Sequence, residues 1–297
     1  MAAGMAAPGH ARALRLQDEL MTTTDAGTHA GHKLQVLTVD LDGQVVKAGI
    51  RPGSDAGPPL LIFNGIGANL ELLAPFVDAL PGIEVILFDV PGAGGSPAPV
   101  LPYRLSSVCV LADRLLSHLG YQGQVDVLGV SWGGALAQEF ARLYAARCRR
   151  LVLAATSPGV LMVPGSLSVL TKMIGVRRYT DPQYLRRIGA DLYGGAFRRD
   201  PDLLDEHGRH MQPPPGRGYL YQLLAAWGWS SLPWLGALRQ PTLVMHGSDD
   251  PIVPPVNARI LAARIPDSTL QMVEDGHLFL VTGPEHAAGI VHGFLRR

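Results

Sequence analysis

The stretch "VDVLGVSWGGALAQEF", from Val125 to Phe140, joins a run of aliphatic and β-branched residues to a segment with helix-forming composition. Gly129, Ser131 and Gly133 form the pattern GxSxG at this junction. A serine placed between small residues at a strand-to-helix turn is typical of a nucleophile elbow, which lifts the hydroxyl above a sheet. Such a turn predicts a positive φ for Ser131, at a cost of about 1–3 kcal/mol.

The sequence around this stretch alternates between buried strands and helices. The expected strands are "PLLIF" (59–63), "EVILFDV" (84–90), "VDVLGV" (125–130), "RRLVLAA" (149–155), "PTLVMHG" (241–247) and "STLQMVED" (268–275). Helical patterns at 70–80, 106–119 and 133–146 separate the first four of them. This alternation predicts an α/β fold with a mostly parallel central sheet flanked by helices.

The beginning of the chain departs from that alternation. Residues 34–50 read as two strands around Asp42 and Gly43, which is the usual signal for a hairpin. Residues 1–31 are expected to form a disordered leader. They carry no basic start followed by an apolar segment, so a secretory signal is not expected.

A second departure begins after the sixth core strand. From 156 to 240 the chain carries Pro, Arg, Tyr and Trp with weak helical patterning. A connection of this length is too long for a loop and predicts a helical cap over the carboxyl edge of the sheet. The α/β core is then formed by 32–155 and 241–297.

Composition narrows the possible partners. The 297 residues are 47% hydrophobic and carry 25 basic and 25 acidic side chains. This balance gives no basic footprint for nucleic acid or an anionic membrane, and no apolar run is long enough to span a membrane. Cys109 and Cys148 lack a CxxC spacing, which predicts free buried thiols in a reducing compartment. We therefore expect a cytoplasmic protein.

A serine hydroxyl needs a base that takes its proton and a carboxylate that orients the base, in the chain order Ser, acid, His. His277 follows the last strand in "VEDGHLFL" and is the expected base. In "HGSDDPIVP" the acid is expected to be Asp250, because "DPIVP" begins there, with Asp249 as the alternative one residue away. Asp275 is expected to be a solvated loop carboxylate.

The remaining histidines are assigned to other roles. His246 lies on a strand and is expected to be a core residue. The others are expected in the leader or at the surface, namely His10, His29, His32, His118, His207, His210, His286 and His292.

Attack on an ester carbonyl creates an oxyanion that needs two hydrogen-bond donors. Trp132 follows the serine and offers its backbone N–H. The second donor is expected from the loop "NGIGAN" (64–69), where Ile66 lies between two glycines. We expect no metal or organic cofactor for this chemistry.

These residues resemble the α/β-hydrolase superfamily, and most closely the bacterial intracellular medium-chain poly(3-hydroxyalkanoate) depolymerases. The similar segments are "PLLIFNGIGANLELLAPFV", "FDVPGAGGS", "GVSWGGALAQEFA", "RRLVLAATSPGVLMVPG", "LYGGAFRRDP" and "DGHLFL". Asn64 stands where most relatives have a histidine. The resemblance implies the α/β-hydrolase fold, with Ser131 as nucleophile, Asp250 as acid and His277 as base. It also implies that Ile66 and Trp132 are the oxyanion donors.

The resemblance further implies hydrolysis of poly(3-hydroxyalkanoate) esters through an acyl-enzyme. The expected partner is a hydrophobic polyester or the surface of its granule, so the protein is either free in the cytoplasm or bound to granules. Asn64, Trp227 and Trp229 are expected to contact substrate, although the tryptophans equally suit a core of the cap itself. The alternatives are a small-molecule carboxylesterase, a carbon-carbon bond hydrolase of the same fold, and a granule-binding protein without activity.

Overall fold

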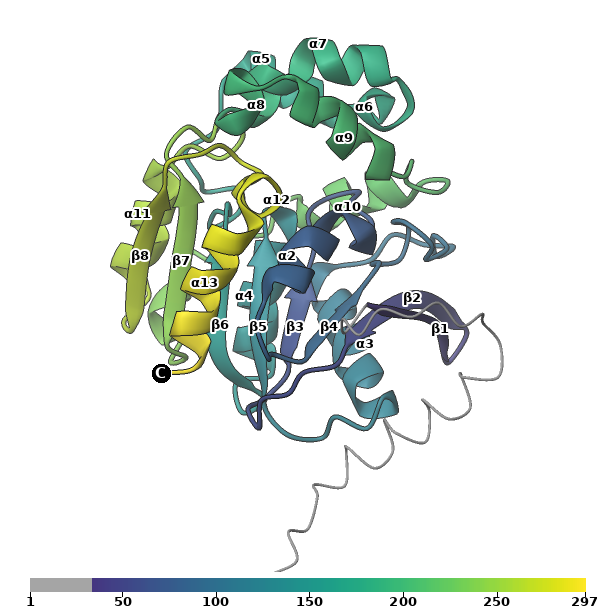
Figure 1. Ribbon diagram of the computed structural model, residues 1–297. Helices are drawn as coiled ribbons and strands as arrows, with labels where there is room; N and C mark the ends of the chain where they lie inside the picture. Colours follow the sequence, from purple (N-terminus) through teal and green to yellow (C-terminus); the bar gives the residue numbers. More distant parts are fainter. Residues whose placement is uncertain (1–33) are drawn as a thin grey trace, which may run out of the picture.

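The computed structural model describes residues 34–297, so the leader expected at 1–31 lies outside the described residues. An eight-stranded sheet has the order β1-β2-β4-β3-β5-β6-β7-β8 (Figure 1). The strands are β1 (Gln35–Leu41), β2 (Gln44–Arg51), β3 (Leu60–Phe63), β4 (Val85–Phe88), β5 (Val125–Val130), β6 (Cys148–Ala154), β7 (Thr242–Gly247) and β8 (Ser268–Val273). From β4 to β8 all neighbouring strands are parallel. The predicted mostly parallel α/β sheet is confirmed.

The antiparallel end of the sheet is the hairpin of β1 and β2. Leu41 pairs with Gln44, and the two turn residues between them, Asp42 and Gly43, have φ values of 56° and 89°. Positive φ at both positions is the geometry of a type I′ turn, which matches the twist of the flanking strands. The hairpin expected around Asp42 and Gly43 is therefore confirmed.

Two layers of helices cover the sheet. One face carries α3 (Leu105–His118), α4 (Trp132–Leu143) and α11 (Val256–Arg264), and the other carries α2 (Ala74–Ala79), α12 (Phe279–Thr282) and α13 (Pro284–Leu295). Strand β3 has apolar side chains on both faces of the sheet, so helices must bury both faces. Its Leu61 and Phe63 belong to the first apolar cluster, whereas Leu60 and Ile62 belong to the second. Burial of each such side chain contributes roughly 1.5–3 kcal/mol.

One expected helix is divided. The pattern over 70–80 predicts a single helix, but the chain forms the 3-10 turn η1 (Leu70–Leu73) followed by α2. Pro75 lies in the first turn of α2. A proline has no N–H to donate to a preceding turn, so it starts a helix more readily than it continues one.

The chain between β6 and β7 forms a helical layer above the carboxyl ends of the strands (Figure 1). We refer to residues 156–240 as the cap. Its elements are α5 (Leu167–Ile174), α6 (Arg177–Thr180), α7 (Pro182–Tyr193), α8 (Ala196–Arg199), α9 (Asp202–His210), α10 (Gly218–Ala226) and η2 (Leu235–Ala237).

The cap has an apolar cluster of its own, which continues into the core. Leu185, Leu192 and Leu204 from the cap pack in one cluster with Ile252 and Val253, which follow β7. The cap therefore rests on the loop that carries the acid expected from the sequence. None of the helices within 34–297 combines the length and apolar character needed to cross a membrane.

Candidate active site

Ser131 lies at the junction between β5 and α4, where its φ is 54° and its ψ is −117°. The positive φ expected for this residue is confirmed. Its backbone N–H donates to Ala154 O at 2.8 Å, and the Thr156 hydroxyl donates to Ser131 O at 2.6 Å. A Cβ on Gly133 would lie 2.2 Å from Phe63 O, so only glycine fits there. The neighbouring strands thus hold the turn in a conformation that a free chain avoids.

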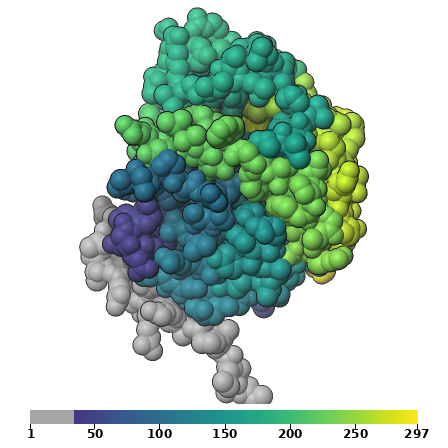
Figure 2. Space-filling view, turned by 180° about the vertical axis from the view of Figure 1, so that it is seen from behind, coloured from purple at the N-terminus to yellow at the C-terminus, as the bar shows by residue number. Residues whose placement is uncertain are grey.

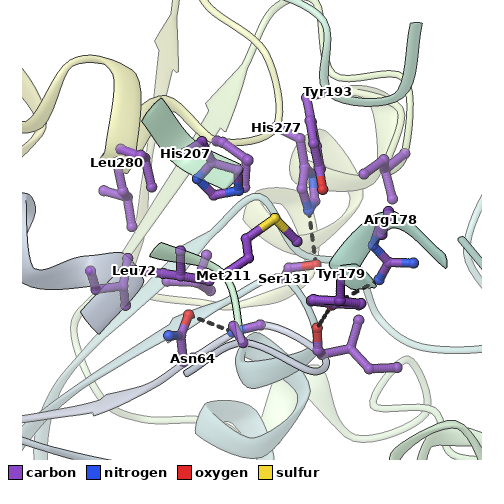
Figure 3. Close-up of a pocket in the computed structure, with 18 of the residues that line it drawn as sticks. Asn64, Leu72, Ser131, Arg178, Tyr179, Tyr193, His207, Met211, His277 and Leu280 are labelled. Carbon is purple, nitrogen blue, oxygen red and sulfur yellow. Dashed lines mark hydrogen bonds between the residues drawn. The ribbon is translucent and has the colours of Figure 1, made fainter. Parts of the chain in front are cut away.

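Three side chains from distant parts of the chain form a continuous hydrogen-bonded row. His277 Nε2 lies 2.9 Å from Ser131 Oγ (Figure 3), and His277 Nδ1 lies 2.7 Å from Asp250 Oδ2. Because a carboxylate only accepts hydrogen bonds, Nδ1 carries the proton and Nε2 is free to accept from the serine hydroxyl. This is the geometry in which a histidine can act as a general base on a serine.

Asp250 is buried and strongly hydrogen-bonded. Its Oδ1 accepts from the backbone N–H groups of Ile252 and Val253, both at 2.9 Å. Burial alone would raise its pKa, but the charge of His277 and hydrogen bonds from His246 and His277 outweigh burial and lower the pKa to about 2. The carboxylate is therefore ionised at neutral pH and can stabilise a protonated His277.

The neighbouring acids do not contact the imidazole. Asp249, the alternative acid, forms an ion pair with Arg198 on the cap. Asp275 was expected in solvent, and this is wrong, because its side chain is buried and accepts from Thr282 Oγ1 and from the N–H of Gly276. Of the two candidates that the sequence left open, the structure brings Asp250 to His277.

Cap residues 193–196 are joined to the loops that carry these acids and His277. The three hydrogen bonds are His277 N to Tyr193 O (2.7 Å), Gly195 N to Asp249 Oδ2 (2.8 Å) and Ala196 N to Asp275 Oδ1 (2.6 Å). All three join backbone or carboxylate groups at the end of the sheet to one turn of the cap. The cap therefore anchors the loops on which the histidine and the acid stand.

Two other histidines lie near the site. His246 is fully buried, as expected for a core strand, and its Nε2 lies 2.8 Å from Val253 O. His207 was expected at the surface, and this is wrong, because only 7% of it is exposed and it lines the same cavity as Ser131 (Figure 3). Burial lowers the pKa of His207 to about 4, so it is neutral at neutral pH.

The expected oxyanion donors lie next to the serine. The backbone N–H groups of Ile66 and Trp132 have no hydrogen-bond acceptor among the residues that the structure describes. A Cβ on Gly65 would lie 3.8 Å from Ser131 Cβ, which places the 64–69 loop beside the nucleophile. Trp132 is the first residue of α4, where helix amides favour negative charge. The loop that carries the Ile66 amide and the helix start that carries the Trp132 amide therefore both adjoin Ser131.

Asn64 lines the cavity and also holds its own loop. Its Oδ1 accepts from Gly65 N at 2.8 Å (Figure 3), and its Nδ2 donates to Asn69 O at 2.9 Å. With both polar atoms engaged in this way, the amide fixes the loop that carries Ile66. The expected contact of Asn64 with substrate stays a prediction.

The cavity above Ser131 is mainly apolar. Its walls come from both the core and the cap, and the apolar side chains include Leu72, Leu73, Met173, Met211, Ile252 and Leu280. Polar groups are few and stand at separate points, with Arg178, Tyr179 and Tyr193 on one side and His207 on another (Figure 3). Such a cavity suits an alkyl chain attached to a neutral polar group.

Trp227 and Trp229 do not line this cavity, so the expectation that they contact substrate stays a prediction and would apply at another surface. Trp227 directly follows α10 as its C-cap residue and is 82% exposed. Trp229 packs edge-to-face on Trp234, and its indole donates to Glu139 at 3.2 Å. Aromatic clustering along a sequence does not say which way each ring points, which is why the sequence did not separate them.

Other residues at the site carried no sequence signal. Arg178, Tyr179 and Gln222 belong to no motif, and they reach the site only because the cap folds over the sheet. Within 34–297, no three or more His, Cys, Asp or Glu side chains are grouped so as to hold a metal ion.

A family model for the alpha/beta hydrolase fold matches residues 58–284. The chain belongs to the α/β-hydrolase fold family.

Within this family, the chain is 52% identical over 261 residues to the poly(3-hydroxyalkanoate) depolymerase of Ectopseudomonas oleovorans, covering 88% of this chain and 92% of the relative. The resemblance to such depolymerases seen in the sequence is thereby confirmed. A pimeloyl-[acyl-carrier protein] methyl ester esterase of Aromatoleum aromaticum is 29% identical over 80% of this chain and 98% of its own length. The crystal structure of the enol-lactonase from Burkholderia xenovorans shares the fold, with a TM-score of 0.75 at 22% identity over 88% of this chain and 100% of that one.

Proposed function

We propose that this protein is a serine hydrolase that cleaves the ester bonds of poly(3-hydroxyalkanoate), in particular polymers with medium-length side chains. The observation that carries the proposal is the hydrogen-bonded row of Ser131, His277 and Asp250 at the floor of an apolar cavity. The similarity to the depolymerase of Ectopseudomonas oleovorans supports the choice of substrate. The triad supports ester hydrolysis as the reaction, and the apolar cavity supports an ester with an apolar side chain as the substrate.

In the first step, Ser131 Oγ attacks the ester carbonyl of the polymer while its proton passes to His277 Nε2. The ionised Asp250 stabilises the imidazolium that forms. When the tetrahedral intermediate collapses, the bond to the alcohol oxygen breaks, and His277 returns the proton to that oxygen. The fragment on the alcohol side of the broken bond leaves with a free hydroxyl. The fragment on the acyl side stays bound to Ser131 as the acyl-enzyme.

In the second step, water attacks the acyl-enzyme with His277 Nε2 as the base. The proton that His277 takes from water then passes to Ser131 Oγ as the acyl–oxygen bond breaks, which releases a carboxylic acid and restores the serine. The N–H groups of Ile66 and Trp132 stabilise the oxyanion in both steps. Loss of one such donor typically costs about 2.7–4 kcal/mol of transition-state stabilisation.

An exposed apolar surface on the cap suits contact with an insoluble polymer. Leu220, Leu224 and Trp227 are spaced by four and three residues, so they lie on one side of α10, and all three are exposed. The exposed side chain of Val100 lies beside α10, because Val100 O accepts from the Tyr221 hydroxyl at 3.2 Å.

Figure 2 shows the light green atoms of α10 and the following segment as a band across this face of the molecule. Exposed apolar side chains that lie on one side of a helix suit contact with an apolar partner. As part of the proposal, this band binds the granule surface in the cytoplasm. A reducing compartment suits the two cysteines, Cys109 and Cys148, which are free and buried.

The proposal is tested with the Ser131→Ala variant. We expect it to fold like the parent and to release no 3-hydroxy acid from an emulsion of medium-chain polymer. A parent that hydrolyses short nitrophenyl esters but leaves the polymer intact would instead be a small-molecule carboxylesterase. Polymer hydrolysis that survives in Ser131→Ala would contradict the assigned nucleophile.

A further inference from the structure

The peptide that joins Ile66 to Gly67 is held by the cap at both of its polar atoms. Ile66 O accepts from the Tyr179 hydroxyl at 2.7 Å, and Gly67 N donates to Gln222 Oε1 at 2.7 Å. Tyr179 comes from α6 and Gln222 from α10, so the two contacts are 113 and 155 residues apart in sequence. The same residue, Ile66, offers its N–H to the oxyanion in the proposed mechanism.

The close approach of the cap requires glycine at position 67. Gly67 has a φ of 68°, and a Cβ there would lie 2.5 Å from the Tyr179 hydroxyl oxygen and 3.0 Å from Tyr219 Cδ2. In the sequence, Gly67 is one of the two glycines that flank Ile66. In the structure it brings the backbone close to two tyrosines of the cap.

Gln222 also contacts the other oxyanion donor residue. Its backbone O accepts from Trp132 Nε1 at 3.0 Å, while its side chain holds Gly67. Gln222 is fully buried, so water does not compete for these bonds. One residue of α10 therefore fixes both the 64–69 loop and the first residue of α4.

Arg178 determines the direction of the Tyr179 hydroxyl. Arg178 Nη2 donates to the hydroxyl oxygens of Tyr179 and Tyr219, each at 2.9 Å. Because Tyr179 Oη accepts from a cation, its own proton points to Ile66 O (Figure 3). Hydrogen bonds from an ionised donor are stronger than neutral ones, so this row is well suited to hold a backbone group in place.

We infer that the cap sets the geometry of the oxyanion hole, with Tyr179 and Gln222 as positioning residues that keep the Ile66 N–H aimed at the oxyanion. The inference rests on the proposed function, because it takes Ile66 as an oxyanion donor. Neither side chain needs to touch the substrate for this role. Their removal lowers stabilisation of the transition state and leaves binding of the ester in its ground state nearly unchanged.

The chain offers a matched pair of variants. Tyr179→Phe removes the hydroxyl that bonds Ile66 O. Tyr219→Phe removes a hydroxyl that also accepts from Arg178 Nη2 but donates within the cap, to Met173 O at 2.5 Å. Each variant removes one hydroxyl that accepts a hydrogen bond from the Arg178 guanidinium. Only Tyr179→Phe also loses the hydrogen bond to the 64–69 loop.

The variants are compared on the soluble ester p-nitrophenyl octanoate and with an alkyl trifluoromethyl ketone. This ketone accepts Ser131 Oγ at its carbonyl carbon and forms a tetrahedral oxyanion, so its affinity reports on the oxyanion hole. For Tyr179→Phe we expect kcat to fall about 10- to 100-fold, less than for loss of a whole donor. We also expect KM to stay within about twofold, and the affinity for the ketone to fall with kcat. Tyr219→Phe is expected to remain within about threefold of the parent in all three quantities.

Equal losses of kcat in Tyr179→Phe and Tyr219→Phe would overturn the inference, because they would report a general loosening of the cap. A rise in KM alone for Tyr179→Phe would also overturn it, by showing a substrate contact. Failure of the proposed function looks different. In that case the parent itself does not bind the ketone, or Ser131→Ala retains activity.

Gln222→Met provides an independent test that holds even where Tyr179→Phe does not fold. It removes the acceptor for Gly67 N and keeps the backbone carbonyl that accepts from Trp132. We expect the same signature, a lower kcat and a weaker affinity for the ketone at unchanged KM. A parent-like kcat and ketone affinity in folded Gln222→Met would contradict the role given to the cap.

Discussion

The edge of the sheet and the cap contribute to the site in different ways. The sheet carries the groups proposed to react, because Ser131, Asp250 and His277 all follow parallel strands whose ends meet at one edge. The cap contributes no member of this row, but its hydrogen bonds hold the loops on which the row and the two amides stand. The cap that forms part of the wall of the cavity therefore also holds the loops of the triad and of the two amides.

The largest effect is expected when the two adjacent aspartates are each replaced by asparagine in separate variants. Asp250→Asn should lower kcat by about 10⁴-fold, because an amide cannot hold the His277 tautomer that accepts from serine. Asp249→Asn weakens the ion pair with Arg198 on the cap and should cost about tenfold or less. The measurement is kcat on a soluble ester for both variants, with thermal unfolding as a control. Similar losses of kcat in Asp250→Asn and Asp249→Asn would contradict the assignment of Asp250 to the reacting groups and of Asp249 to the supporting ones.

A second prediction concerns the stability of the elbow. Gly133→Ala places a Cβ 2.2 Å from Phe63 O, where rigid strand backbone cannot move away, and should lower the free energy of unfolding by about 3 kcal/mol or more. Gly123→Ala meets nothing within 4 Å and is the control, expected within about 0.5 kcal/mol of the parent. Urea unfolding of both variants measures the difference. A tolerated Gly133→Ala would mean that the elbow is not clamped by β3.

A third prediction concerns how the free energy of unfolding depends on pH through His207 of the cap. The pKa of His207 is lowered to about 4 in the folded protein, below its ordinary value, so the unfolded chain binds a proton first as pH falls. Its contribution to stability is therefore fully present above about pH 6.5 and is lost as pH falls towards 4, by up to about 1.4 kcal/mol per pH unit. His207→Phe should flatten this part of the curve of unfolding free energy against pH. An unchanged slope would show that His207 is not buried.

The smallest expected effect lies on the outer surface of the cap. Trp227→Gln should reduce adsorption to a polymer emulsion several-fold, since an exposed aromatic side chain loses its contact with the apolar surface. Leu143→Gln changes an exposed side chain on α4 and is the matched control. Binding isotherms for the two variants give the comparison. Equal adsorption by Trp227→Gln and the parent would remove this residue from the proposed granule surface.

Much of the core could be predicted because its signals are local. The GxSxG pattern fixes Ser131 at a strand end, and the order of parallel strands places His277 and Asp250 at the same edge. Their neighbourhood then follows from the fold, even though 146 residues separate His277 from Ser131.

The contributions of the cap could not be predicted in the same way. Tyr179 and Gln222 act through single hydrogen bonds to a distant loop, and no spacing in the sequence records such contacts. The errors at Asp275 and His207 have a similar cause, since Asp275 accepts from Ala196 N of the cap and His207 packs against Tyr193 and Phe197, and no local pattern records such contacts. The outward position of Trp227 could not be predicted either, because composition gives the apolar character of a segment without the direction of its side chains.

The central claim is that Ser131 carries the acyl group of the polyester during turnover. Its most direct test is to mix the protein with a trimer of 3-hydroxyoctanoate, quench in acid within milliseconds to seconds, and map the digested protein by mass spectrometry. The account predicts a 3-hydroxyacyl adduct on the peptide that contains Ser131. Rapid trimer hydrolysis with no adduct at any quench time, or with the adduct on another residue, would contradict it.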